Sequence, residues 1–375
     1  MDYIREFDIQ LDKEQYYAGE TVCGKVILDT IENFQMKSIL SGGIRVALRG
    51  KAHTEWKVML SGDRRTVKED QYFIDQRQTI WGEKHAIGKK SIIPRGVHKF
   101  PFSFDLPESA LPCSFESRVG QIRYFFKVII DIPYASPPQG MKYFTIIGPH
   151  IDCMDEHYLK PIVLENRRST CCWCCKRGTV SLKSVLERSA YVCKESIKLK
   201  VTIDNQGEED VWLRIRLEQI CEYFIDRGVL GVSKEQKNLV LEYKGNPVKA
   251  QKKIKWDSGN VLVIPVVPTT LVNICRLIQI YYVLTVSLDT AKETDLVSVN
   301  MPLTIATVPF RIPNSGLNKT IKYEPASTHV EGGQYLAPDF LLGQVYDGNE
   351  HYLREPIVLY KPVYVTIDKS EYTEY

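Results

Sequence analysis

The feature that most constrains the fold of this chain is a regular alternation of apolar and polar residues with a period of two. In the first half, runs of this kind are bounded by glycine, proline or aspartate and cover residues 7–12, 22–28, 44–49, 100–106 and 124–130. The second half repeats the pattern over residues 197–203, 213–217 and 278–286. Such alternation is typical of strands that bury one face and expose the other. The sequence therefore predicts an all-β protein built from two sandwiches.

Two less regular segments are also interpreted as strands. The apolar stretch from Val261 to Leu288 is interrupted by prolines and by Arg276, and a charge inside hydrocarbon is costly. It is therefore interpreted as core strands and not as a membrane span. The segment Ser181–Ala190 also satisfies helical spacing, which periodicity alone cannot settle, and is interpreted as a strand.

Composition limits the classes of function. Of the 375 residues, 44% are hydrophobic and 25% are charged, which supplies enough apolar material for two domains with their own cores. The 49 basic and 46 acidic side chains leave a net charge of +3, whereas binding to a phosphate backbone usually requires a large basic excess. Nucleic acid is therefore not an expected partner.

A diverged internal repeat supports the division into two domains. Six positions of the first half recur 175 positions later with the same or similar residue types, and duplication explains this more simply than chance. The pairs are Tyr16/Tyr191, Glu20/Glu195, Val22/Ile197, Val26/Val201, Leu28/Ile203 and Asp29/Asp204. We predict a first domain over residues 1–160, a cysteine-rich basic linker over 161–178, a second domain over 179–313 and a tyrosine-rich tail over 314–375.

An ordered set of motifs resembles the arrestin domain-containing (α-arrestin) family between residues 7 and 313. In the first half the motifs are Tyr17–Val26, Phe100–Pro107, Leu111–Glu116 and Gly120–Tyr124. In the second half they are Tyr191–Glu195, Ile264–Thr269 and Ile274–Val286. The resemblance implies two arrestin-like (immunoglobulin-like) β-sandwich domains joined by a short hinge, plus a C-terminal tail. The family's usual Pro-Gly before the second glutamate is Cys193-Lys194 here, which leaves the geometry of that turn open.

The same resemblance implies a function and a set of partners. Proteins similar to α-arrestins are non-enzymatic adaptors that bind membrane receptors or transporters and recruit HECT-type ubiquitin ligases, which directs the cargo into endocytosis or endosomal sorting. The expected location is the cytoplasm, with recruitment to the plasma membrane and endosomes, and residues 1–6 contain no apolar secretion signal. A structural sorting-coat subunit of the retromer type, without ligase recruitment, is the alternative.

The ligase contact of the family is a Pro-Pro-x-Tyr motif that WW domains bind as an extended segment, and this sequence lacks it. The nearest approach in the tail is Lys361-Pro362-Val363-Tyr364, in which lysine replaces the first proline. Pro362 and Tyr364 are therefore a candidate degenerate WW-domain motif. The competing interpretation is that Ile357-Val358-Leu359 and Val363-Tyr364-Val365 pack as a final strand or act as a tyrosine-rich partner segment.

A basic segment contains four closely spaced cysteines, Cys171, Cys172, Cys174 and Cys175. A zinc site would need ligands from a second chain segment, and the sequence offers no second pair, so no metal is expected. S-acylation suits cysteines that lie beside tryptophan and basic residues at an anionic membrane surface, and would give peripheral membrane contact. Reduced thiols that pack as small apolar side chains are the third interpretation, and a redox enzyme would need a thiol of low pKa here.

Basic residues at outward strand positions are candidate contacts for phosphate groups of cargo, because guanidinium groups pair well with phosphate oxygens. These residues are Arg45, Arg49, Lys51, Arg214 and Arg216. The alternative is that they only keep a strand face in water and protect sheet edges. The sequence has no nucleophile elbow, phosphate loop or His-Glu-x-x-His motif. We therefore expect no catalytic residue and no cofactor.

Overall fold

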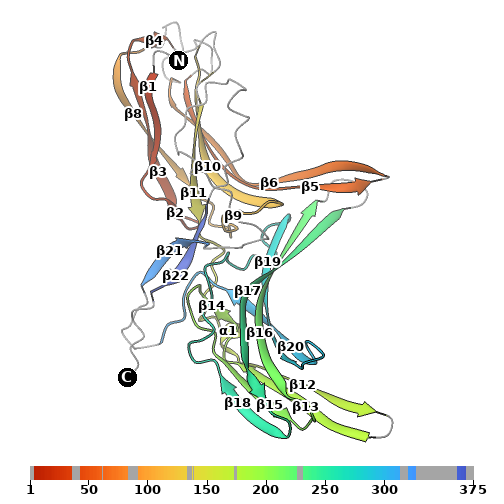
Figure 1. Cartoon of the computed structure of the whole chain (residues 1–375). Coiled ribbons are helices and arrows are strands. Elements are labelled where there is room, and N and C mark those ends of the chain that lie inside the picture. Colours follow the sequence, from red (N-terminus) through yellow and green to blue (C-terminus); the bar gives the residue numbers. More distant parts are fainter. Residues whose placement is uncertain are drawn as a thin grey trace. The chain divides into compact units, whose positions relative to one another are not determined.

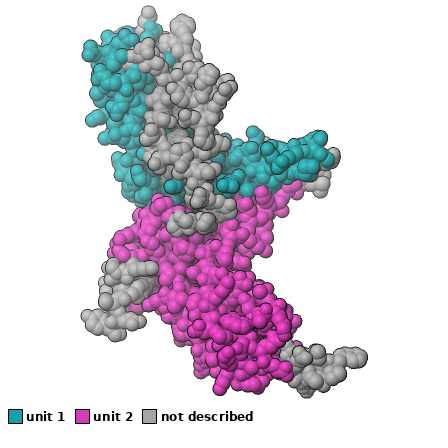
Figure 2. Space-filling view, viewed as in Figure 1, with its two compact units in different colours: residues 1–148, 225–229, 335–362 teal, residues 149–224, 230–334, 363–375 magenta. Residues whose placement is uncertain are grey.

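The computed structural model describes residues 4–35, 43–60, 62–82, 92–132, 137, 139–172, 175–225, 231–312, 320–326 and 361–368. Regular structure in these residues is almost entirely β (Figure 1). The described residues divide into two compact units at Gly148 and Pro149, with Ile225 and Lys361–Pro362 grouped with the first unit (Figure 2). The predicted all-β class with two sandwiches is confirmed.

The first unit contains a three-stranded and a six-stranded sheet. The smaller sheet has the order β1 (Ile4–Leu11), β3 (Thr21–Thr30), β8 (Gly96–Asp105). The larger sheet has the order β2 (Gln15–Tyr16), β11 (Gln139–Ile146), β10 (Gly120–Ile130), β5 (Ile44–Leu60), β6 (Asp63–Trp81), with β9 (Phe115–Glu116) paired to β10. Two short strands, β4 (Phe34–Gln35) and β7 (Ile92–Ile93), form a separate pair.

Aromatic side chains from both sheets form the core of the first unit. Phe102 and Phe104 of β8 meet Phe126 of β10 at ring-centroid distances of 5.0 and 5.5 Å. Phe126 also stacks on Phe144 of β11 at 5.5 Å. These residues occupy alternate positions of their strands, so the period-two pattern of the sequence places all of them on inner faces. Large aromatic rings bury much apolar area each, and this cluster holds the two sheets together.

The second unit contains a four-stranded and a five-stranded sheet. The four-stranded sheet has the order β12 (Ile162–Cys172), β13 (Cys175–Leu186), β15 (Leu199–Asn205), β18 (Lys252–Asp257). The five-stranded sheet has the order β14 (Ala190–Tyr191), β20 (Val297–Ile305), β19 (Ile278–Asp289), β16 (Val211–Ile225), β17 (Val232–Val248). A single-turn helix, α1 (Glu156–Leu159), precedes β12, and the tail supplies β21 (Ile321–Pro325) and β22 (Val363–Ile367).

The predicted linker over residues 161–178 is wrong. This segment forms β12 and the beginning of β13, which pair as an antiparallel hairpin inside the second unit. Because β12 is an edge strand that pairs only with β13 among the described residues, few of its side chains need burial. Its basic, polar composition therefore resembles that of a linker. The chain instead passes from one unit to the other at Gly148–Pro149.

The structure agrees with most of the prediction for one of the two less regular segments and only in part with that for the other. The strand predicted at Ser181–Ala190 is confirmed as far as Leu186, where β13 ends, and residues 187–189 lie between β13 and β14. The stretch Val261–Leu288 is strand only from Ile278 onward, and residues 261–277 contribute isolated bridges. Prolines at positions 265 and 268 remove backbone donors that a central strand needs. Its apolar side chains are nevertheless core residues, since Leu262 and Ile264 are fully buried.

The duplicated glutamates, Glu20 and Glu195, close the same turn in both units. The Tyr17 N–H donates to Glu20 Oε2 at 2.9 Å, and the Val192 N–H donates to Glu195 Oε2 at 3.2 Å. Gly19 has a φ of 80°, and Lys194 takes the same left-handed conformation with a φ of 67°. The turn geometry is therefore retained without Pro-Gly, at the cost of placing a lysine in a conformation that favours glycine.

Candidate functional site

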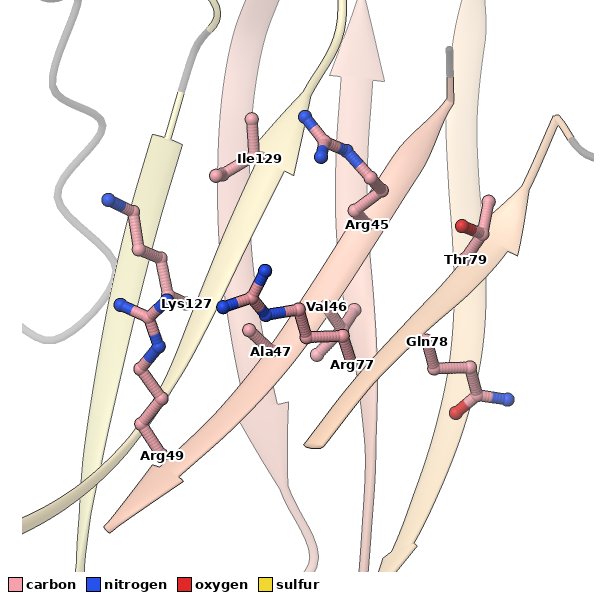
Figure 3. A pocket seen from close by; sticks show the side chains of 9 residues that line it. All are labelled: Arg45, Val46, Ala47, Arg49, Arg77, Gln78, Thr79, Lys127 and Ile129. Carbon is pink, nitrogen blue, oxygen red and sulfur yellow. The ribbon is translucent and has the colours of Figure 1, made fainter. Parts of the chain in front are cut away.

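The outer face of the larger sheet of the first unit carries a basic pocket of about 220 Å³ (Figure 3). Its cations come from three adjacent strands: Arg45 and Arg49 from β5, Arg77 from β6 and Lys127 from β10. Ala47 lies directly opposite Lys127 on one side and Arg77 on the other in the strand register. Cross-strand neighbours on one face approach closely. The small side chain of Ala47 therefore leaves a hollow that the four cations surround.

Carboxylates neutralise only part of the positive charge of this pocket. Arg45 makes a bidentate ion pair with Asp131 at 2.8 and 2.7 Å. Arg49 and Arg77 share Asp75, at 3.3 and 3.2 Å. Burial alone would raise the pKa of Asp75, but the hydrogen bonds and charges of Arg77 and Arg49 hold that pKa below its ordinary value.

Lys127 is the unneutralised cation of the pocket. Within the described part of the chain, no carboxylate lies within ion-pair distance of its ammonium group. Desolvation, and then the neighbouring positive charge of Arg49, lower the pKa of Lys127. Two like charges are therefore held together in a partly buried place. An anion that entered the pocket would remove this repulsion and form charge-assisted hydrogen bonds.

On the equivalent face of the second unit, nearby carboxylates neutralise the positive charge of the arginines. Arg214 of β16 pairs with Glu242 at 2.7 Å and with Asp289 at 3.6 Å. Arg216 pairs with Asp295 at 2.7 Å. Three carboxylates thus surround two arginines. This arrangement favours a structural ion-pair network over an anion site.

Strand register shows why the two faces differ. In both units an arginine contacts an aspartate diagonally across the strand pair, Arg45 with Asp131 and Arg214 with Asp289. Counting from these pairs, the second unit has Thr285 at the position of Lys127 and Glu218 at the position of Arg49. Arg216 takes the position of Ala47. The hollow and its surplus cations are therefore specific to the first unit.

Lys51, which the sequence predicts as a phosphate contact together with Arg45 and Arg49, does not line the pocket. A register shift between Gly50 and Lys51 places Lys51 opposite Tyr72. Its ammonium group lies 3.5 Å from Asp70 and 6.0 Å from the Tyr72 ring centroid. Asp70 also accepts a hydrogen bond from His53 at 2.7 Å. Lys51 thus belongs to a neighbouring polar cluster that already contains an anion.

The cysteine cluster lies at the end of the β12–β13 hairpin and not in a linker. Cys172 and Cys175 are opposite each other in the register, and Cys171 is opposite Lys176. Residues 173–174 and the side chains of residues 170–177 lie outside the described part of the structure. Earlier in β12, Arg168 forms an ion pair with Glu293 at 2.5 Å.

The candidate WW motif lies in and next to a strand. Val363-Tyr364-Val365 is the beginning of β22, as the competing interpretation has it, whereas Ile357-Val358-Leu359 of that interpretation lie outside the described residues. Pro362 is buried, and Tyr364 is only 2% exposed and lies opposite Glu324 of β21. A WW domain needs both side chains at the surface to bind them in its groove. In this conformation the motif is therefore inaccessible.

Two buried thiols, Cys193 and Cys275, are poorly suited to nucleophilic or redox chemistry. Burial raises the pKa of Cys193 to about 12 and that of Cys275 to about 11. Both thiols are therefore protonated at neutral pH, and the thiolate is the reactive form. Among the residues that the structure describes, no group of three or more His, Cys, Asp and Glu is placed to hold a metal ion. No helix among them is long and apolar enough to span a membrane.

Comparison with known proteins identifies both units. Residues 6–152 match the family model "Arrestin (or S-antigen), N-terminal domain", and residues 176–310 match "Arrestin (or S-antigen), C-terminal domain". Arrestin domain-containing protein 4 of Mus musculus is 26% identical over 301 residues, which cover 79% of this chain and 69% of that protein. Arrestin domain-containing protein 17 of Caenorhabditis elegans is 28% identical over 218 residues, 56% of this chain and 50% of that protein. With both arrestin domains in order, the chain belongs to the arrestin domain-containing (α-arrestin) family.

Proposed function

We propose that this protein is a non-enzymatic adaptor that binds cytoplasmic segments of membrane receptors or transporters and links them to ubiquitination, endocytosis and endosomal sorting. Membership of the arrestin domain-containing family supports a general adaptor role. The pocket around Ala47 supplies the contact, and phosphate groups on the cargo are its ligands. The observation that carries this assignment is Lys127, which is held beside Arg49 without a carboxylate of its own among the described residues.

The proposed contact is selective for dianionic groups over single carboxylates. Arg45, Arg49, Arg77 and Lys127 face two carboxylates, Asp75 and Asp131, so two positive charges are in excess. A phosphate monoester carries close to two negative charges at neutral pH and three acceptor oxygens. It therefore matches both the charge and the number of donors better than an aspartate or glutamate side chain does.

Ligase recruitment requires a different contact from the one common in the family. The sequence has no Pro-Pro-x-Tyr motif, and Tyr364 of the degenerate motif is 2% exposed. These two observations favour the second candidate function, a structural sorting-coat subunit of the retromer type that assembles with fixed partners and recruits no ligase. The two functions differ in their partners and not in the pocket.

Affinity capture from detergent-solubilised membranes tests the proposed function. The wild-type chain is compared with Lys127→Glu, which opposes an anion in the pocket, and with Lys25→Glu, which changes an exposed lysine on the other sheet of the same unit. We expect the wild type and the Lys25 variant to enrich phosphorylated receptors or transporters, and the Lys127 variant to lose them. Equal cargo capture by all three chains would refute the pocket as the contact. A fixed set of coat proteins in place of cargo would support the second function.

The cysteines at the end of the β12–β13 hairpin are proposed as S-acylation sites that hold the adaptor at the membrane. Arg167 and Arg168 of β12 precede them, and basic residues next to an acyl chain strengthen binding to anionic lipids. We expect hydroxylamine to release thioester-linked chains from Cys171, Cys172, Cys174 or Cys175, as detected by mass spectrometry of the membrane-bound protein. Free thiols at all four positions would eliminate this proposal.

A further inference from the structure

Strand β22 of the tail lies between two other segments of the second unit. Along one edge it pairs antiparallel with β21 from Ile321↔Ile367 to Pro325↔Val363. At its other edge Thr366 forms a parallel bridge with Cys193. β21 has β22 as its only partner among the described strands. β21 and the chain around Cys193 therefore form the two walls of a groove that β22 fills.

The side chains of β22 are buried far more completely than those of β21. Tyr364, Val365 and Ile367 are each 2% exposed, and Thr366 is fully buried. In β21, Ile321 and Tyr323 are 39% and 37% exposed. Most of the apolar contact area is thus provided by β22, the more C-terminal of the two strands. A two-stranded sheet is marginal by itself, so the position of β21 depends on an occupant of the groove.

Polar contacts define the register and direction of the occupant. The Thr366 hydroxyl shares its single proton between two acceptors, the Lys322 carbonyl oxygen and Glu324 Oε1, both at 3.3 Å. Lys322 pairs with Asp368, directly after the strand, at 2.5 Å. Lys194 pairs with Glu324 at 2.5 Å and so connects the two walls. An occupant is therefore recognised by an aromatic residue, a hydroxyl two positions later and an acidic residue two positions after that.

We propose that this groove is a peptide-binding site of the β-strand-addition type, which β22 occupies in cis and from which an extended partner segment of the same pattern displaces it. Main-chain pairing supplies affinity in such sites and alternate side chains supply specificity. β22 has only five residues and is joined to β21 through residues 327–360. Its release therefore breaks one short ladder and leaves both sheets of the sandwich intact. Short strands with few contacts belong to the part of a structure that opens locally.

A full-length chain with a disabled cis strand tests the proposal. Tyr364→Asp introduces a charge at a buried position of β22 and leaves both walls unchanged, whereas Lys361→Asp changes an exposed residue next to the same strand. The probe is a fluorescent peptide of residues 361–368 with the wild-type sequence. A tethered strand has an effective concentration on the order of 1 mM, so for a peptide that binds the open groove with a Kd of about 10 μM it raises the apparent Kd by a factor on the order of 100. We expect the probe to bind the Tyr364→Asp chain about 100-fold more tightly than the wild type or the Lys361→Asp chain.

Equal, weak binding of the probe to all three chains, with the Tyr364→Asp chain still folded by circular dichroism, would overturn the proposal. A dimer formed when the wild-type chain is mixed with the Tyr364→Asp chain would support it, with a second copy as the donor of the strand.

Amide hydrogen exchange of the wild-type chain tests the proposal without a variant. We expect the amides of Val363–Ile367 to exchange through local opening, at least 100-fold faster than those of β15. Exchange of both strands at the same rate would show that β22 leaves only on global unfolding and would contradict the proposal.

Discussion

Replacing Glu195 by alanine is expected to lower the free energy of unfolding of the second unit by about 3–5 kcal/mol, because it leaves a buried arginine without its counter-ion. Arg188 lies 2.6 Å from Glu195, and the two side chains are only 9% and 5% exposed. The guanidinium group is enclosed by the rings of Tyr191 and Phe310, at 3.9 and 4.8 Å from their centroids. With only 9% of its side chain exposed, Arg188 has little contact with water that could compensate for the lost carboxylate. The same substitution also removes the acceptor of the Val192 N–H.

The duplicated position supplies the control for this prediction. Glu20 closes the equivalent turn of the first unit, but its partner Lys13 is 57% exposed and Glu20 itself is 33% exposed. Glu20→Ala should therefore cost about 1 kcal/mol, the usual value for one exposed ion pair and one hydrogen bond. Urea denaturation of the two variants checks both values. If Glu195→Ala were no more destabilising than Glu20→Ala, the buried ion pair would contribute nothing beyond the turn.

Replacing Lys127 by methionine is expected to weaken binding of a phosphoserine peptide at least tenfold, which corresponds to about 1.4 kcal/mol, and at the same time to leave the chain as stable or more stable. A charge-assisted hydrogen bond contributes about 1.5–3 kcal/mol to such a contact. In the absence of the anion, methionine keeps the apolar stem of the lysine and removes its repulsion with Arg49. Calorimetric titration measures the affinity, and thermal unfolding measures the stability.

The opposite signs of the two effects separate a binding residue from a structural one. If Lys127 stabilised the sheet, its replacement would lower the stability of the chain whether or not anions are present. Lys25→Met provides the matched change at an exposed lysine on the other sheet of the first unit, where both affinity and stability should remain within about 0.5 kcal/mol of the wild type. A Lys127→Met chain that is destabilised but binds the peptide normally would contradict the assignment of the pocket.

Period-two alternation predicted the fold because it records a local property, the burial of one face of each strand. Residues such as Phe102 and Phe126 occupy inner positions whichever strands they meet. The pattern fails where a strand has little to bury. The edge strand β12 is polar along most of its length, and for this reason residues 161–178 were predicted to be a linker.

The candidate site was predictable only in part, because it depends on strand register. Arg45 and Arg49 were found from their outward positions on one strand. Arg77 and Lys127 were missed, since nothing local shows that they lie beside Ala47. One signal was available: Lys127 is the charged residue among the outward positions of the run 124–130. The carboxylates that neutralise Arg214 and Arg216 come from residues 28 to 79 positions away, which no pattern within a strand reveals.

The position of β22 also affects how the chain would respond to a protease. Residues 327–360 begin after β21 and end before β22, so both of their ends are attached to the same two-stranded sheet of the second unit. One cut within this segment would separate the chain into two fragments that β21–β22 pairing, the Lys322–Asp368 ion pair and the Thr366–Cys193 bridge continue to join. The two fragments would therefore stay associated under native conditions. The tail fragment would dissociate only when another strand replaces β22 in the groove.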